Sequence, residues 1–372
     1  MKRKIDIVLF LWLGCLLQSA GQNNNNGLAE LFQDHFKVGA AISNRLYNAH
    51  NSDLDTIVRN NFNSVVAVNC MKSERIQPDE GVFVFKDADS FVKYGEANDM
   101  FIVGHTLVWH SQAPDWFFVD EAGNNVSREV LIDRMEKHIK TLVGRYKGRV
   151  HGWDVVNEAV VSEGDGWRRS KWYEIIGEEY VELAFQFAHE ADPDAELYYN
   201  DYNLYVPARR EATIKVVKRL LDKGIRIDGI GMQAHYLLDT PLEQIKTSVD
   251  AFASLGVNVL VTELDISVLP FPNENVSADV GLSIEYKEKY DPYRNGLPNE
   301  MEQKLRDKYV DLFKIYMSQK AVSRVTFWGV SDRYSWKNNF PVKNRTDYPL
   351  LWDREFKPKV AFHGICDLMK KQ

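Results

Sequence analysis

Two glutamates, each at the end of an apolar run of the sequence, are the strongest candidates for acid/base catalysis. Glu158 lies at the end of an apolar stretch that begins at Trp153, and Glu263 follows a second stretch at residues 257–262. Branched and aromatic apolar residues in such runs are typical of buried β-strands. A carboxyl group at the end of each of two buried strands can supply an acid and a base to one bond. Taken singly, either glutamate could equally be a solvated loop residue or an ion-pair partner, so the interpretation depends on what surrounds the pair.

The elements that would position these glutamates alternate along the chain. Strands are expected at residues 38–42, 64–68, 101–105, 153–159, 196–200, 229–235, 257–265 and 324–330. Helices are expected between and after them, among them 128–146, 173–191 and 357–369; the apolar face of the first would hold Val130, Leu131, Met135, Ile139 and Leu142. Eight strands alternating with eight helices predict an α/β fold, the (β/α)8 TIM barrel, in a single domain. A doubly wound open sheet is the alternative, but it would not usually need eight repeats.

Polar and aromatic side chains gather where the expected strands end. In a barrel of this kind the carboxyl ends of the strands converge at one mouth, where active sites lie. Such a concentration is hard to explain by stability alone. The residues concerned are Asn69, Lys72, His105, Asn157, Glu158, Asn200, Asp201, Gln233, His235, Glu263, Asp265 and Trp328.

Seven short stretches, in chain order, resemble the motifs of glycoside hydrolase family 10, the endo-1,4-β-xylanases. They are NCMK at 69–72, GHTLVWHSQ at 104–112, WDVVNEA at 153–159, YNDYN at 199–203, GMQAH at 231–235, TELD at 262–265 and TFWGVSD at 326–332. Any one motif is weak support, but seven in this order cover essentially all of residues 28–372. The resemblance implies endo-hydrolysis of β-1,4-xylosidic linkages in xylan.

The resemblance also implies roles for individual residues. Glu158 would be the general acid/base and Glu263 the nucleophile of a retaining double displacement, and the nearby charge of Glu263 would raise the pKa of Glu158. His235 would hydrogen-bond the nucleophile, Asp265 would orient His235, and Asn157 would bind the sugar 2-hydroxyl. Further substrate ligands would be Asn69, Lys72, His105, Trp109, Gln233, Tyr202, Trp328 and Trp336.

Without the motifs, several of these residues would have simpler interpretations. A histidine such as His235 is more often a buried residue with satisfied hydrogen bonds, and tryptophans at strand ends are mostly core residues. Two other functions therefore stay open: a glycan-binding module without catalysis, and a related retaining barrel glycosidase that acts on β-glucan or mannan. Both glutamates argue against the first, and the motifs at 104–112 and 231–235 favour xylan over the second.

The sequence differs from the usual pattern of this family at one position and contains one long additional segment. Val68 stands where the family usually has a glutamate before the asparagine of its first motif. That carboxylate would hold a sugar hydroxyl one subsite beyond the cleaved residue, so either affinity there is weaker or the accepted xylan decoration differs. Residues 267–299 form a long segment rich in Pro, Asn and Tyr, which we interpret as a surface insertion rather than a catalytic loop.

The start of the chain predicts export. Basic residues at positions 2–4 precede an apolar run at 7–17, and small residues follow at 19–21. The apolar run is too short to span a bilayer as a mature helix. We therefore expect a signal peptide at 1–21, an Asn-rich tether at 22–27 and the catalytic domain at 28–372.

Composition narrows the partners and the compartment. The net charge of −7 argues against a nucleic-acid partner, and we expect a monomer that acts on xylan or xylo-oligosaccharides. Cys15 could carry a lipid anchor, but Trp12 occupies a position where Leu is usual, so ordinary cleavage and an exported protein are favoured. Cys70 and Cys366 make no disulfide framework, and no metal-ligand spacing occurs, so we expect packed thiols and no cofactor or metal.

Overall fold

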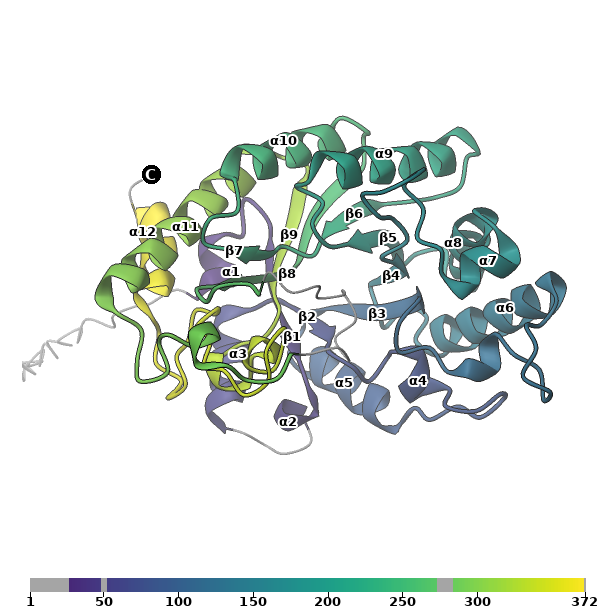
Figure 1. Cartoon of the computed structure of the whole chain (residues 1–372), viewed down its shortest axis with the longest axis horizontal. Helices are drawn as coiled ribbons and strands as arrows, with labels where there is room; N and C mark the ends of the chain where they lie inside the picture. The colour runs from purple at the N-terminus through teal and green to yellow at the C-terminus, as the bar shows by residue number, and fades with distance from the viewer. Residues whose placement is uncertain (1–26, 48–51, 273–283, 371–372) are drawn as a thin grey trace, which may run out of the picture.

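The computed structural model describes residues 27–47, 52–272 and 284–370 (Figure 1). The predicted signal peptide, Cys15 and all of the tether except Gly27 lie outside these ranges. Among the described residues, none of the helices has the length and hydrophobicity that crossing a membrane requires.

Eight parallel strands close into a barrel, as predicted. Each strand pairs with the next around the ring, and the last pairs with the first. The strands are buried along nearly their whole length because helices cover their outer face and side chains fill the interior. The ring consists of β1 (Lys37–Ile42), β2 (Ser64–Ala67), β3 (Phe101–Trp109), β4 (Gly152–Asn157), β5 (Glu196–Asp201), β6 (Gly229–Met232), β8 (Asn258–Ser267) and β9 (Val322–Phe327).

Helices surround the strands on the outside (Figure 1). In α6 the apolar residues at helical spacing face inward, and Ser127 caps the helix by accepting a hydrogen bond from Val130 N. Val130 itself is 41% exposed, so its assignment to the apolar face was wrong. The longer helices are α3 (Ser52–Asn61), α5 (Lys86–Ala97), α6 (Arg128–Arg145), α8 (Glu179–Ala191), α9 (Pro207–Asp222), α10 (Leu242–Ala253), α11 (Asn299–Ser318) and α12 (Val360–Lys370).

Short helices occupy the connections. Among the described residues, the short α-helices are α1 (Leu28–Leu31), α2 (Asn44–Tyr47), α4 (Ser73–Ile76) and α7 (Lys171–Ile176). The 3-10 helices in the same ranges are η1 (Asp115–Phe117), η2 (Glu288–Tyr290), η3 (Asp332–Tyr334) and η4 (Trp336–Asn338). Cys70 and Cys366 are free thiols.

Two predicted elements are each divided in two. The strand expected at 229–235 forms β6 and β7 (His235–Leu237), because Ala234 takes a φ of +64° and turns the chain; β7 pairs with β8 outside the ring. The helix expected at 173–191 forms α7 and α8, because Gly177 ends the first helix at a φ of +88°. Local apolar pattern carries no information about either turn.

Two strands also end at residues other than those predicted. β3 extends to Trp109, four residues past the prediction, whereas β9 stops at Phe327 and leaves Trp328 in the loop that follows. The long segment after β8 holds only η2 among its described residues, and residues 273–283 lie outside the described part of the chain.

Candidate active site

Glu158 follows β4 and Glu263 lies on β8, with β5 and β6 between these strands in the ring, and a chain of side-chain amides joins the two glutamates. Gln233 Nε2 donates to Glu158 Oε1 at 2.9 Å and lies 3.3 Å from the Asn157 amide. The amides of Asn157 and Asn200 lie 2.9 Å apart, and Asn200 Nδ2 donates to Glu263 Oε1 at 2.9 Å. The strand ends therefore bring both carboxyl groups into one hydrogen-bonded network.

Glu158 sits where β4 gives way to a tight turn. Its φ is +61°, a left-handed conformation that is uncommon outside glycine, and its N–H donates to Asn200 O at 2.8 Å. Only 7% of the residue is exposed. Its second carboxyl oxygen accepts from Trp109 Nε1 at 2.9 Å, and its carbonyl oxygen accepts from Arg168 Nε at 2.7 Å.

The surroundings of Glu158 favour its neutral form. Burial raises the pKa of Glu158, and the negative charge of Asp201 raises it further, against the hydrogen bonds from Gln233 and Trp109. The leading charge is thus Asp201, whereas the sequence pointed to Glu263. A carboxyl group with a raised pKa can hold a proton at a pH where most carboxyl groups have lost theirs.

Glu263 is as buried as Glu158, but its surroundings favour the ionised carboxylate. Burial alone would raise its pKa, but the hydrogen bond from His235, the charges of His105 and His235 and the bond from Asn200 together hold the pKa of Glu263 below its usual value. His235 Nε2 lies 3.2 Å from Glu263 Oε2. Glu263 is therefore the member of the pair that stays ionised.

His235 is supported in turn by Asp265. Its Nδ1 lies 3.0 Å from Asp265 Oδ1, and Trp336 Nε1 donates to Asp265 Oδ2 at 2.7 Å. Burial would lower the pKa of His235, but the charge of Asp265 and the contacts with Asp265 and Glu263 raise it. The geometry therefore places Glu263, His235 and Asp265 in the order that the sequence predicted.

Lys72, in the loop after β2, contacts Asn69, Gln112 and Trp109. Lys72 Nζ donates to Asn69 Oδ1 at 3.0 Å and to Gln112 Oε1 at 2.7 Å, and it lies 5.0 Å from the centroid of the Trp109 ring. Burial lowers the pKa of Lys72 to about 8, although the charges of Glu263 and Glu158 act in the other direction. The ammonium group of Lys72 therefore interacts electrostatically with both Glu158 and Glu263.

The other predicted ligands surround this centre. His105 Nδ1 is 2.8 Å from Asp154 Oδ2, and its ring lies 5.4 Å from that of Trp328. Tyr202 is placed by two arginines: Arg168 donates to its hydroxyl at 2.9 Å, and the Arg209 guanidinium stacks 4.0 Å from its ring centroid.

Several residues of the site received no role from the sequence. Asn200 and Asp201 were noticed only as strand-end polar residues, although the YNDYN motif contains both. Asp201 is fully buried and is bonded to Arg209 and to Tyr199, whose hydroxyl lies at 2.6 Å. Arg168 follows a loop and has no spacing signal that could have identified it.

His110 and Val68 complete the surroundings. His110 Nδ1 lies 3.8 Å from Glu158 Oε2, and burial, with the charges of Arg168 and Arg209, lowers the pKa of His110 to about 3, so this imidazole is neutral. Val68 is half-buried beside the end of β1, where its N–H donates to Ile42 O at 3.2 Å. Within the described ranges, no three or more His, Cys, Asp or Glu side chains are grouped as a metal site would require.

Comparison with known proteins identifies the family. Residues 27–368 match the profile of glycosyl hydrolase family 10. The chain belongs to this family. The resemblance seen in the sequence motifs is thereby confirmed, as is the (β/α)8 barrel.

Relatives in this family match over almost their whole length. An endo-1,4-beta-xylanase A of Xylanibacter ruminicola is 46% identical over 352 residues, which is 94% of this chain and 95% of that protein. An endo-1,4-beta-xylanase of Geobacillus stearothermophilus is 41% identical over 92% of this chain and 98% of its own. Among solved structures, a GH10 endoxylanase retrieved from a sugarcane soil metagenome superposes with a TM-score of 0.88 at 43% identity, covering 92% of this chain and 100% of the other.

Proposed function

We propose that this protein is an endo-1,4-β-xylanase that cleaves xylan by a retaining double displacement, with Glu158 as acid/base and Glu263 as nucleophile. The observation that carries the proposal is that two equally buried carboxyl groups share one hydrogen-bond network but have different neighbours, which shift the pKa of Glu158 up and the pKa of Glu263 down. Two carboxyl groups whose environments push their pKa values apart are the expected acid and nucleophile of a retaining site. Family membership and the xylanase names of the relatives support the substrate.

In the first step, Glu158 gives its proton to the leaving glycosidic oxygen while the Glu263 carboxylate attacks the anomeric carbon. The bond to the leaving sugar breaks, and a glycosyl ester forms on Glu263. His235, aligned by Asp265, keeps Glu263 ionised until it attacks. Asn157 hydrogen-bonds the sugar 2-hydroxyl, a contact that strengthens in the transition state.

In the second step, Glu158 is a carboxylate and removes a proton from the attacking water. Water attacks the anomeric carbon from the face that the leaving group vacated, so the product keeps the β configuration. Asn69, Lys72, His105 and Gln233 bind sugar hydroxyls, Trp109, Trp328 and Trp336 line the cleavage subsite, and Tyr202 supports the leaving-group sugar.

The proposal extends to the whole chain. Residues 28–372 form the catalytic domain of an exported, monomeric enzyme, and residues 1–21 are removed on export. Mass spectrometry of the mature protein should find an N-terminus near Gln22; a diacylated Cys15 would establish the lipoprotein alternative instead.

The test is a time course of products from linear xylan, read by chromatography and by ¹H NMR of the anomeric protons. A retaining endo-enzyme releases mixed xylo-oligosaccharides early, with new reducing ends in the β configuration. Initial α products would exclude retention. Faster hydrolysis of carboxymethylcellulose or mannan would favour the related glycosidase, and no hydrolysis of any glycan would leave only a binding module.

A further inference from the structure

A buried lysine lies beside the carboxylate that supports His235 and has no part in the mechanism above. The Lys337 side chain is 7% exposed, and its Nζ lies 3.6 Å from Asp265 Oδ1. The same Asp265 oxygen lies 3.0 Å from His235 Nδ1. One carboxylate oxygen is therefore shared between an imidazole and an ammonium group.

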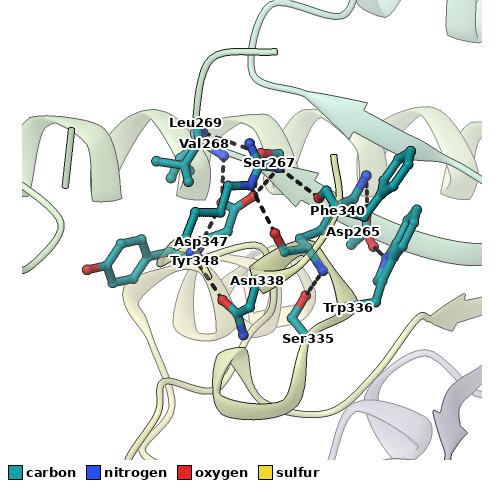
Figure 2. Close-up of polar contacts among 12 residues, drawn as sticks. Asp265, Ser267, Val268, Leu269, Ser335, Trp336, Asn338, Phe340, Asp347 and Tyr348 are labelled. Atoms are coloured by element: carbon teal, nitrogen blue, oxygen red, sulfur yellow. Dashed lines mark hydrogen bonds and ion pairs between the residues drawn. The ribbon is translucent and has the colours of Figure 1, made fainter. Parts of the chain in front are cut away.

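The loop that carries Lys337 is fixed to the end of β8. Lys337 belongs to η4, next to Trp336, and its Nζ lies 4.4 Å from the centroid of that indole ring. Figure 2 shows Trp336 against Asp265, two residues before Ser267 on the strand. Trp336 and Asp265 therefore contact the same ammonium group, and Trp336 is itself hydrogen-bonded to Asp265.

Asp347 and Arg345 hold that loop in place from its other end. The fully buried Asp347 accepts from Ser267 Oγ and from the N–H groups of Val268, at 3.2 Å, and Tyr348, at 2.8 Å (Figure 2). Arg345 Nε donates to Lys337 O at 2.9 Å. These bonds tie the backbone of η4 to the strand that carries Glu263 and Asp265.

We propose that Lys337 is a positioning residue that, through Asp265, sets how firmly the His235 imidazole holds its proton against Glu263. This inference rests on the proposed function, since it assigns Lys337 to the proposed nucleophile. A cation buried beside a carboxylate reduces the charge that the carboxylate offers to a second partner. Lys337 therefore competes with His235 for Asp265.

The electrostatics agree with this geometry. The charge of Lys337 lowers the pKa of His235, while that of Asp265 raises it. The other charged or titratable groups that face this centre are Glu263 on β8, His105 on β3, Lys72 after β2, Tyr309 on α11, and Arg345 and Asp347 in the loop. Arg345 is paired with Asp347, and burial raises the pKa of Tyr309 so far that it stays neutral, so neither replaces Lys337 beside Asp265.

The competition affects the two chemical steps differently. A cationic His235 donates a stronger, charge-assisted hydrogen bond to Glu263 than a neutral imidazole does, and this bond weakens Glu263 as a nucleophile in the first step. The same bond assists Glu263 when it leaves the glycosyl ester in the second step. By lowering the fraction of His235 that is cationic, Lys337 favours formation of the ester.

The test compares Lys337→Met and Lys337→Gln, which are neutral, with Lys337→Arg, which keeps the charge. NMR titration of the His235 ring, assigned by the signal that His235→Asn removes, should show its pKa raised by roughly one pH unit in both neutral variants and not in Lys337→Arg. With nitrophenyl β-xylobioside, kcat/KM should fall roughly three- to tenfold, while kcat, limited by the second step, should hold or rise.

Lys308 provides the matched control, because it is another buried lysine, on α11, whose ammonium donates to Thr240 O. Lys308→Met should leave the His235 titration and the ratio of the two kinetic constants unchanged. An unchanged His235 pKa in both neutral Lys337 variants, or the same kinetic change in Lys308→Met, would overturn the proposal. A wild type that does not hydrolyse xylan would instead overturn the proposed function, and the His235 titration can be measured in either case.

Discussion

The surroundings of Glu158 and Glu263 differ although the residues are the same type and are buried to the same degree, at 7% and 5% exposure. The donors to Glu158 are neutral, an indole and an amide, and the fully buried Asp201 lies nearby. Glu263 receives a bond from Asn200 and another from an imidazole that a second carboxylate supports. Burial alone would raise both pKa values, so the neighbours decide which group remains ionised.

Under the proposed function, this difference gives the two glutamates different roles, with Glu158 as the acid/base and Glu263 as the nucleophile. Neutral donors satisfy the lone pairs of Glu158 without compensating its charge, so the protonated form of Glu158 is favoured. The imidazole compensates the charge of Glu263, which therefore stays a carboxylate in a buried site. Removing either glutamate should greatly reduce activity on xylan, and changing one neighbour at a time should move the pKa of a single glutamate.

The largest effect is expected from Glu263→Ala. Without a nucleophile the glycosyl ester cannot form, so activity should fall by roughly four or more orders of magnitude on both xylan and nitrophenyl glycosides. Initial rates on both substrates measure this. Glu300→Ala, which changes an exposed glutamate on α11, is the control and should retain full activity.

Glu158→Ala should distinguish the two substrates. Xylan hydrolysis should fall by roughly 10²–10⁴-fold, the usual size of general acid catalysis, whereas nitrophenyl leaving groups need little protonation and should leave the first step nearly intact. The glycosyl ester should then accumulate, because water lacks its base.

Added azide should rescue the turnover of Glu158→Ala and give a β-glycosyl azide, since the anion needs no deprotonation and a second inversion restores the starting configuration. NMR of the product measures this outcome. An α-glycosyl azide, or rescue of Glu263→Ala in its place, would exchange the two roles.

The sequence predicted the barrel and the position of the glutamates because both depend on patterns that local residues carry. Alternating apolar runs fix the strand order, and the motifs identify which strand ends meet. It could not predict the turn at Ala234, because a φ of +64° there has no side-chain signal, and β7 therefore appeared as part of β6. The sequence also did not identify Asp201 as the leading charge that raises the pKa of Glu158, because the packing of Asp201 against the 158–160 turn is a tertiary contact. Asp201 Oδ2 accepts from Val160 N at 3.3 Å.

Removing the imidazole should make Glu263 resemble Glu158. In His235→Asn, burial is no longer opposed by the bond and charge of His235, so the pKa of Glu263 rises. Because Glu263 must be ionised to attack, the acid limb of the kcat/KM profile should move to higher pH, by roughly one to two pH units. A pH profile with nitrophenyl β-xylobioside measures the shift, and an acid limb that stays at the wild-type pH would contradict this account of Glu263. The wild-type alkaline limb, which reports Glu158, should stay in place as the internal control.

The smallest effect is expected from the neighbours of Glu158, because burial, which no single neighbour supplies, is the leading cause of its raised pKa. Asp201→Asn removes a negative charge and leaves Arg209 uncompensated, and both changes lower the pKa of Glu158. Since Glu158 must be protonated for the first step, the alkaline limb of kcat/KM should move to lower pH, by roughly half a pH unit. Arg168→Gln removes a positive charge that lowers the pKa of Glu158, so it should move the same limb to higher pH. The opposite signs distinguish electrostatics from general damage, which would lower kcat/KM in both variants without moving either limb.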